Sequence, residues 1–466
     1  MHRILRQVVE VEVQGGEGAA LALQRVIADL CREAAAARLE AALTAFDPGD
    51  ALLVIDRLTV DLGDVRPERL EAALTERLPS AVAAGLRDRG WTVGERPTGG
   101  ELAPALGPTE ALLEAVLHFL RRGRLPWWYS LEEGRSLEER FLAVLASGVD
   151  GGRAEGAKPG GRPPFPAALA KALREDARTR ERLLLQFSAA TLLAVLELLD
   201  PERHRLLWRV LRSSRMPASG HLRHRMEASL IEVALHAVVG AAPAETCATE
   251  DALFRTAAAR LGSRLPEGER DAIARLAPLP ISVVDPFPTP VLPPAPDEAV
   301  VEEGLPVEDA GLVLLHPFLP RFLELLGTAG GDVLLRPSRA ALLLHHLATG
   351  ELTAEEHVLV LAKVLCGLPI DGALPRESPV TPEEGREAVA LLESVMRHWA
   401  VLRGTSADGL RGNFLARSGR LELRDGDWLL RVERRPHDVL LESLPWGIGH
   451  VKLPWMPRLM HVEWAP

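Results

Sequence analysis

Three histidines, His345, His346 and His357, are the first candidates for metal ligands, because imidazoles on neighbouring helices can converge on zinc. Adjacent residues on one helix, however, point about 100° apart. No HExxH motif or carboxylate partner is spaced to complete the ligand set. We therefore interpret these histidines as ordinary core or surface residues and expect no bound metal.

Nucleotide binding and acyl hydrolysis each require a glycine-containing turn that this sequence lacks. Gly447-Ile448-Gly449 has no third glycine and no dinucleotide-binding βαβ context, and no GK[ST] is present. No GxSxG elbow occurs, and residues 404–409 (GTSADG) are interpreted as a helix N-cap region. Carboxylate pairs such as Asp425 and Asp427 lie in a turn context, where structural roles are usual. We therefore predict no catalytic residue, no cofactor and no enzymatic activity.

Composition excludes further classes of protein. A chain of 466 residues with 47% hydrophobic and 26% charged residues is typical of about three globular domains. The net charge of −11 argues against general duplex binding, because phosphate contacts need a concentrated positive surface. No run of 18 apolar residues predicts membrane insertion, and the charged N-terminus does not resemble an export signal. The three cysteines form no CxxC pair and fit a reducing cytoplasm: Cys31, Cys247 and Cys366.

Residues 1–92 are predicted to form a small βαβα domain. Residues 3–13 and 51–62 alternate apolar and polar side chains, which is typical of strands. Residues 19–46 and 67–86 carry leucines at helical spacing. The order of these four segments gives the βαβα prediction.

The middle of the chain is predicted to be helical. Residues 109–148 form an appendage in which one helix ends at Gly123 and another begins at a capping box from Ser136 to Glu139. Residues 149–166 are rich in Gly, Pro and charge, and are predicted to be a flexible linker. Residues 167–276 resume as helices, with Asp200-Pro201 as N-cap and first residue of one of them. Residues 167–200 lack Pro and Gly, which allows a helix of at most about 50 Å.

Residues 277–310 are predicted to be an extended acidic tether, because residues 276–320 contain 11 prolines and seven acidic residues but no Lys or Arg. Residues 311–466 are predicted to be a compact α+β domain. Its helices are expected near 316–326, 338–349, 354–366 and 382–403, with capping boxes from Thr353 to Glu356 and from Thr381 to Glu384. A hairpin is expected over 420–434 around Asp425-Gly426. The predicted fold class is therefore a predominantly helical α+β protein.

Tryptophans are the most unusual feature, since five of the nine lie in the last 68 residues. Tryptophan at a turn motif either fills a domain core or anchors a partner protein, and both interpretations stay open. The candidate partner-contact residues are Trp127, Trp128, Trp446, Lys452, Trp455 and Trp464.

Several uncommon motifs occur in a fixed order along the chain. They are IDRLTVDLG (55–63), HFLRRGRLPWW (118–128), LLHPFL (314–319), LHHLATGE (344–351), LCGLP (365–369), GTS (404–406) with GLR (409–411) and FL (414–415), LPWGIGHVKLPWM (444–456) and VEW (462–464). In this order they resemble the tape measure proteins of contractile injection systems, the phage-tail-like particles of the antifeeding-prophage type. The resemblance is dense after residue 311, whereas residues 149–310 match only in their helical, leucine-rich character.

The resemblance implies a non-enzymatic assembly protein that sets the length of the inner tube and sheath. It implies contacts with inner tube, baseplate and sheath or cap proteins, self-association in several copies, and assembly in the cytoplasm of the producing cell with retention in the tube lumen. The 36 prolines exclude one straight helical rod, because Pro inside a helix costs about 3 kcal/mol. Two hypotheses stay open: a length-setting scaffold, or an assembly chaperone or adaptor that nucleates the tube or readies cargo while length is set elsewhere.

Overall fold

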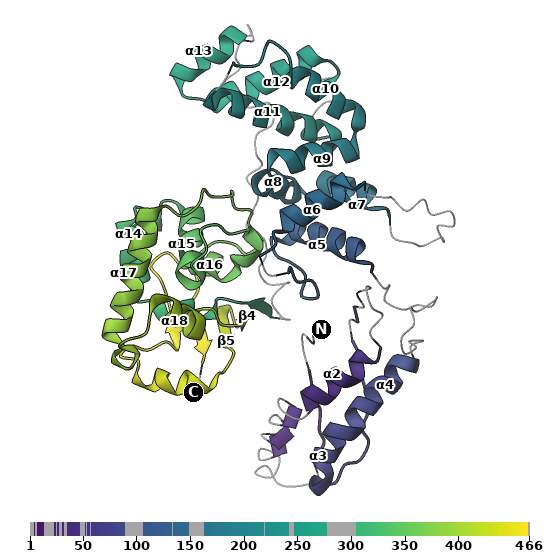
Figure 1. Cartoon of the computed structure of the whole chain (residues 1–466), viewed down its shortest axis with the longest axis vertical. Coiled ribbons are helices and arrows are strands. Elements are labelled where there is room, and N and C mark those ends of the chain that lie inside the picture. The colour runs from purple at the N-terminus through teal and green to yellow at the C-terminus, as the bar shows by residue number, and fades with distance from the viewer. Residues whose placement is uncertain are drawn as a thin grey trace. The chain divides into compact units, whose positions relative to one another are not determined.

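Figure 1 shows the computed structural model of the chain. Its described residues form two compact units, one ending at Glu114 and including Trp127–Ser130, the other comprising Ala115–Pro126 and the residues from Leu131 onward. The residues that the structure describes are 4, 7–13, 23–24, 26–27, 30–31, 35–46, 52, 54–55, 57–88, 106–132, 134–148, 163–218, 220–241, 247–276 and 304–464.

The first unit is built on two helical segments that lie side by side in Figure 1. The first segment contains α2 (Ala36–Thr44). The second is continuous through η2 (Pro67–Arg69), α3 (Leu70–Ala72), the π-helical turn η3 (Ala73–Arg77) and α4 (Leu78–Asp88). Their facing sides share one apolar core that includes Leu39, Leu74, Val82 and Leu86. The predicted helix over 67–86 is therefore confirmed.

The two predicted strands of this unit are not strands in the described residues. The described part of 3–13 has no regular secondary structure and is exposed, with Val8 at 61%. In 51–62, Leu52 forms one isolated antiparallel bridge with Leu106. The alternation itself is present, because Leu58, Val60 and Leu62 pack against the helical core between exposed neighbours. A strand also needs a paired neighbour, and the described residues supply only that single bridge, so the βαβα arrangement stays a prediction.

The second unit begins with a set of helices that we call the helical body, defined as residues 115–126, 131–148 and 163–276. Its elements are α5 (Pro108–Arg122, whose first turns belong to the first unit), α6 (Leu137–Ala146), α7 (Phe165–Glu175), α8 (Ala177–Gln186), α9 (Ala189–Leu199), α10 (Pro201–Leu211), α11 (His221–Val238), α12 (Glu250–Ser263) and α13 (Glu267–Leu276). The capping box from Ser136 to Glu139 is confirmed, and Asp200 caps α10 by accepting a hydrogen bond from the Arg203 N–H at 2.9 Å.

Residues 167–200 form three helices, α7, α8 and α9, although neither Pro nor Gly interrupts them. Asp176 ends α7 and caps α8, accepting the Arg178 N–H at 2.9 Å. Ser188 caps α9 by accepting a hydrogen bond from the Thr191 N–H. Short polar side chains break helices because they satisfy backbone N–H groups locally. The longest described helix of this unit is α11, whose 18 residues span about 27 Å.

The second part of this unit, which we call the C-terminal domain, comprises residues 304–464. Its helical elements are η6 (Ala310–Leu315), α14 (Leu319–Leu325), α15 (Pro337–Thr349), η7 (Glu356–Val358), α16 (Val360–Leu365), α17 (Pro382–His398), η8 (Ala400–Leu402), α18 (Ala407–Leu410), η9 (Arg411–Leu415) and η10 (Pro436–Ser443). Its strands are β1 (Leu305–Val307), β2 (Ala329–Gly330), β3 (Val333–Leu334), β4 (Gly419–Arg424), β5 (Asp427–Val432), β6 (His450–Val451) and β7 (Met460–Glu463).

Five of these strands form one mixed sheet in the order β1-β4-β5-β7-β6, in which only β5 and β7 are parallel. The β4–β5 hairpin turns at Asp425 (φ 53°) and Gly426 (φ 87°), as predicted. The capping box from Thr381 to Glu384 at the start of α17 is also confirmed. With this small sheet among many helices, the predicted predominantly helical α+β fold is confirmed.

The predicted tether ends earlier than expected. Residues 305–307, which the prediction placed in the tether, pair with β4, with Leu305 opposite Leu421. Leu305 and Val307 are buried, while Pro306 between them is exposed. Because β1 is an edge strand, it tolerates a residue without an N–H. The C-terminal domain therefore begins at about residue 304, and the remaining tether residues, 277–303, lie outside the described residues.

The buried carboxyl of Asp309 provides a test of this fold. Asp309 lies between β1 and η6, is only 4% exposed, and its Oδ2 has no hydrogen-bond partner among the described residues. Burial raises its pKa to about 6, although His345 opposes the shift. The folded state therefore holds this proton more firmly than the unfolded chain does, and the associated stability is lost as the pH rises through about 6.

We expect Asp309→Asn to raise the free energy of unfolding at pH 8 by at most about 3 kcal/mol, because the variant carries no buried charge. The melting temperature should rise accordingly. At pH 4.5, where Asp309 is neutral in the folded state, the difference between the variant and the original chain should be much smaller. Circular dichroism melts at both pH values test this. A lower melting temperature for the variant at pH 8 would show that the ionised carboxylate is needed.

Candidate functional site

Two of the candidate tryptophans connect separate segments of the C-terminal domain. The indole Nε1 of Trp446 donates to the Leu314 carbonyl at 3.0 Å, and that of Trp455 donates to the Leu365 carbonyl at 2.9 Å. Both rings are half-buried against the core. A Cβ on Gly367 (φ 65°) would lie 2.6 Å from the Trp455 carbonyl oxygen, so LCGLP and KLPWM also meet through their backbones. The motifs thus hold one another in place.

Trp464 lies inside the core at 6% exposure. Its Nε1 donates to Asp438 Oδ2 at 3.1 Å, and the guanidinium of the buried Arg417, which also pairs with Asp438, lies 5.4 Å from the centre of the Trp464 ring. Lys452 is exposed, next to the segments that carry Trp446 and Trp455.

In the first unit, Trp127 and Trp128 are both half-buried, and the Trp128 ring meets Tyr129 edge to face at 6.1 Å. Trp464 is therefore buried, the other candidate tryptophans keep part of their surface exposed, and Lys452 is exposed. Partner contact through these residues stays a prediction.

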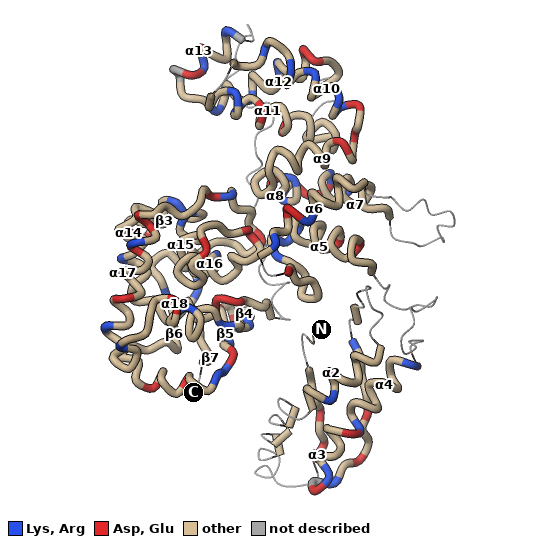
Figure 2. Tube along the Cα trace, in the orientation of Figure 1, with Lys and Arg blue, Asp and Glu red and all other residues tan. Residues whose placement is uncertain are grey.

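The most unusual arrangement in the second unit is a buried group of charges, Arg182 from α8, Glu356 from η7 and Lys363 from α16, which we call the charged cluster. The side chains of all three are at most 1% exposed. Arg182 Nε lies 3.1 Å from both Glu356 carboxylate oxygens, and Lys363 Nζ donates to the same carboxylate. In Figure 2, positions of both signs are interspersed over the described elements, so the cluster is distinguished by its burial.

The remaining donors of the cluster are satisfied by backbone carbonyls. Arg182 Nη1 donates to Leu120 of α5 and Nη2 donates to Asp371, each at 2.6 Å. Lys363 Nζ donates to Ile370 at 3.0 Å and to Gly372 at 2.8 Å. Burial lowers the pKa of Lys363, and the neighbouring Glu356 carboxylate opposes that shift. The cluster therefore fixes α5, α8, η7, α16 and the segment after α16 relative to one another.

Gly123, at the end of α5, closes one side of the cluster. Its φ of 71° favours glycine. A Cβ at this position would lie 2.5 Å from Glu356 Oε1 and 3.0 Å from Arg182 Nη2. The glycine predicted to end a helix thus also leaves room for the buried ion pair.

Glu355, next to Glu356, caps a helix from a distant part of the chain. Its carboxylate accepts hydrogen bonds from Ser136 Oγ at 2.8 Å and from the Leu137 N–H at 3.0 Å, at the start of α6. Glu138 of that helix pairs with Arg376 and accepts from Thr191 Oγ1 at 2.8 Å. Burial raises the pKa of Glu138, but hydrogen bonds from Ser188, Thr191 and Arg376 outweigh it and lower the pKa.

The predicted capping box from Thr353 to Glu356 is wrong, because Glu356 is part of the charged cluster and η7 has no side-chain cap. A capping box is predicted from the spacing of neighbouring residues alone. The burial of Glu356, by contrast, depends on α8, which lies more than 150 residues earlier in the sequence. One signal could have identified the cluster: Lys363 is one of only four lysines and interrupts the apolar run 358–367 (VLVLAKVLCG). A lone cation in such a run needs a buried partner.

The three histidines first considered as metal ligands have other neighbours. His345 Nε2 lies 3.2 Å from the Glu351 carboxylate, and His346 Nδ1 lies 2.9 Å from the Glu351 carbonyl. His357 meets the Phe119 ring edge to face at 6.1 Å. Within the described residues, no group of three potential ligands is placed to hold a metal, and no helix is long and apolar enough to cross a membrane.

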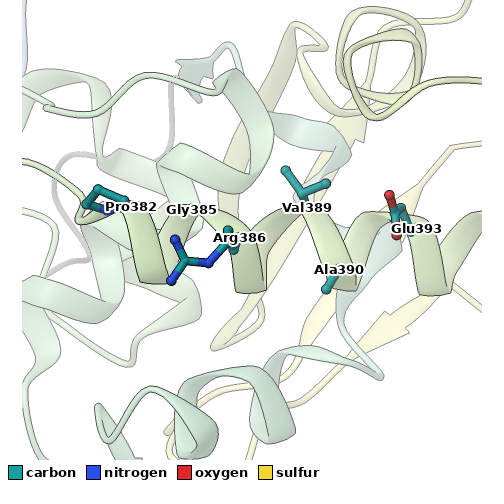
Figure 3. Close-up of a pocket in the computed structure, with 6 residues that line it drawn as sticks. All are labelled: Pro382, Gly385, Arg386, Val389, Ala390 and Glu393. Atoms are coloured by element: carbon teal, nitrogen blue, oxygen red, sulfur yellow. The ribbon is translucent and has the colours of Figure 1, made fainter.

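Figure 3 shows a hollow of about 460 Å³ along the outer side of α17. All six lining residues belong to this one helix, so the hollow is an open surface: Pro382, Gly385, Arg386, Val389, Ala390 and Glu393. The lining holds no histidine, serine or cysteine that could act as a base or nucleophile.

We expect Trp455→Phe to destabilise the C-terminal domain by about 1 to 3 kcal/mol, because the Leu365 carbonyl loses its indole donor. Thermal melts followed by circular dichroism measure this effect. Lys452→Ala, a neighbouring change at an exposed position, is the control and should leave the melt unchanged. An unchanged melt for Trp455→Phe would favour a role in partner contact over a structural one.

We expect Glu356→Ala to destabilise the protein by about 3 to 5 kcal/mol, because two buried cations lose their counter-charge. The triple variant Arg182→Met, Glu356→Leu, Lys363→Met removes every charge of the cluster and should recover much of that loss. Chemical denaturation of the three proteins tests the expectation. A triple variant that is less stable than Glu356→Ala would contradict the electrostatic explanation.

Comparison with protein families shows that the model of the contractile injection system tape measure proteins matches residues 1–464. The chain matches none of the curated proteins and none of the solved structures with which it was compared. The family match extends through the middle residues 149–310, where the motifs alone gave little resemblance. This match confirms the resemblance inferred from the motifs: the chain belongs to the family of contractile injection system tape measure proteins.

Proposed function

We propose that this protein is a length-setting scaffold for the inner tube and sheath of a contractile injection particle. The family assignment supports a structural role in the particle, in association with its tube and sheath components. The observation that carries the mode of action is that even the longest continuous helical segment among the described residues, 67–88, spans only about 33 Å. Length is therefore set by the spacing of folded parts along the chain, and a single rod has no role in it.

In this proposal the folded parts dock on the inner tube and the baseplate during assembly in the cytoplasm. The partly exposed Trp127, Trp128, Trp446 and Trp455 and the exposed Lys452 are the candidate contacts, since Trp is enriched at interface hot spots. Sheath or cap proteins are further candidate partners, and several copies act together. The protein then stays in the tube lumen, and it needs no cofactor and catalyses no reaction.

A second function, assembly chaperone or adaptor, is favoured by the same short helices. A chain of compact parts suits a protein that nucleates the tube on the baseplate or readies cargo, with length set elsewhere. The two functions differ in one measurable property, the dependence of particle length on the distance between the folded parts.

Deleting residues 167–275 would be a poor test, because it removes Arg182 and leaves Glu356 and Lys363 without their partner. We therefore propose to duplicate residues 281–300, which lie between the helical body and the C-terminal domain and outside the charged cluster. Twenty added residues extend by up to about 60 Å in a polyproline-type conformation. The control appends the same 20 residues after Pro466, where they add mass without separating the two parts.

A length-setting scaffold predicts uniformly longer particles from the duplication, by up to about 60 Å, and original lengths from the control. Electron microscopy of purified particles measures both length distributions. Unchanged lengths with fewer particles would reject the scaffold function and favour the chaperone or adaptor.

A further inference from the structure

The helical body and the C-terminal domain have separate apolar cores among the described residues. The core of the C-terminal domain runs from Leu305 to Trp464 and includes no described residue of the helical body. The helical body has its own buried residues, such as Leu183, Val195, Leu230 and Phe254. An apolar core shared between two parts would hold them together permanently. Because the described residues of these two parts share none, other contacts join them.

Many of those contacts are polar, beside the edge-to-face contact of the Phe119 ring with His357. Arg182 reaches from the helical body to Glu356 and to the Asp371 carbonyl, and Arg122 lies 3.4 Å from the Asp371 carboxylate. Gln186 Nε2 donates to the Leu374 carbonyl at 2.6 Å, and its Oε1 accepts from the Glu356 N–H at 3.3 Å. Other polar contacts among the described residues are those of Glu355 with the start of α6, of Arg376 with Glu138, and of the Arg376 N–H with the Leu185 carbonyl.

Such an interface can separate without exposing a large apolar surface. Every group that loses a protein partner on separation, such as Arg182, Gln186 or Glu355, can instead bind water. A buried ion pair adds little net stability, because hydration compensates charges that return to solvent. The fixed docking geometry, the many polar contacts and the separate apolar cores together describe an interface suited to reversible separation.

We propose that the helical body undocks as a unit from the C-terminal domain during particle assembly, by separation of Arg182 from the Glu356–Lys363 pair. This inference takes its biological role from the proposed length-setting function. The Glu356–Lys363 pair stays within the C-terminal domain and remains neutral overall. The 27 residues between the two parts, 277–303, remain as the covalent connection and would span about 85 Å in a polyproline-type conformation. Undocking thus lets compact parts measure a distance longer than any of their helices.

The variant Arg182→Met tests undocking, because it removes the cation of the interface and leaves Glu356 paired with Lys363. The matched control is Arg339→Met. Arg339 is also a buried arginine that pairs with a glutamate, Glu384, and donates to backbone carbonyls, but all of its partners lie within the C-terminal domain. Small-angle X-ray scattering of the full chain gives the radius of gyration of each protein.

We expect Arg182→Met to increase the radius of gyration at unchanged helix content by circular dichroism, and Arg339→Met to leave it unchanged. If Arg182→Met loses helix content, the milder double variant Gln186→Leu, Arg376→Ala takes its place. Equal radii of gyration for the interface variant and the control would overturn the proposal.

A disulfide across the interface tests the role in assembly. The Arg376 N–H donates to the Leu185 carbonyl at 3.1 Å, so a Leu185→Cys, Arg376→Cys pair places two thiols on adjoining backbones of the interface. The half-buried Cys31 is replaced by Ser to avoid exchange. The oxidised chain should assemble no particles of normal length, and reduction should restore them. Normal particles from the oxidised chain would overturn undocking during assembly.

The outcomes distinguish this inference from the function on which it rests. If the oxidised chain blocks assembly while the duplication of residues 281–300 leaves length unchanged, undocking stands and the length-setting function fails. If the duplication lengthens particles and the oxidised chain still assembles them normally, length setting stands and undocking fails.

Discussion

The carboxylate of Glu356 is the group on which the arrangement of the second unit depends. It lies between two cations, Arg182 and Lys363, and none of the three side chains is more than 1% exposed. A single unpaired charge at this depth would be strongly destabilising, so the three positions constrain one another and their surroundings. Gly123 must lack a side chain, and carbonyl groups from α5 and from residues 370–372 must face the cluster.

Tryptophan has a comparable role inside the C-terminal domain. Trp446 and Trp455 each place a large ring against the core and donate an indole N–H to a backbone carbonyl that a short helical element leaves free. Trp399, which is fully buried, donates to the Leu440 carbonyl and to the Ser443 hydroxyl oxygen. Short helices have many unsatisfied carbonyls relative to their length. A domain assembled from short helical elements and a small sheet therefore benefits from a side chain that is both bulky and a single donor.

Local sequence signals predicted much of this fold, including the capping boxes at Ser136 and Thr381, the N-cap at Asp200 and the hairpin at Asp425-Gly426. Each depends on neighbouring residues alone. Local signals do not encode pairing with distant residues: Glu356 has the spacing of a capping residue but pairs with Arg182, and the alternating segment before residue 14 has no sheet among the described residues. The division at Asp176 and Ser188 had a readable signal, since both are good N-cap residues, but the absence of Pro and Gly favoured one helix. A partner-contact role for the tryptophans stays a prediction, because it depends on other proteins, which no pattern within this chain encodes.

The burial of Lys363 also determines how the protein reacts with amine-directed reagents. The chain has only four lysines, and of these Lys171 and Lys452 have exposed side chains, whereas the Lys363 amine is enclosed by Glu356 and two carbonyl groups. Acylation or reductive methylation of the native protein therefore modifies the exposed amines and spares Lys363. Because burial lowers the pKa of Lys363, more of its amine is in the neutral, nucleophilic form than in an ordinary lysine. Its slow modification in the native protein is thus a matter of access, and the extent of labelling at this one residue reports how often the interior of the cluster is open to solvent.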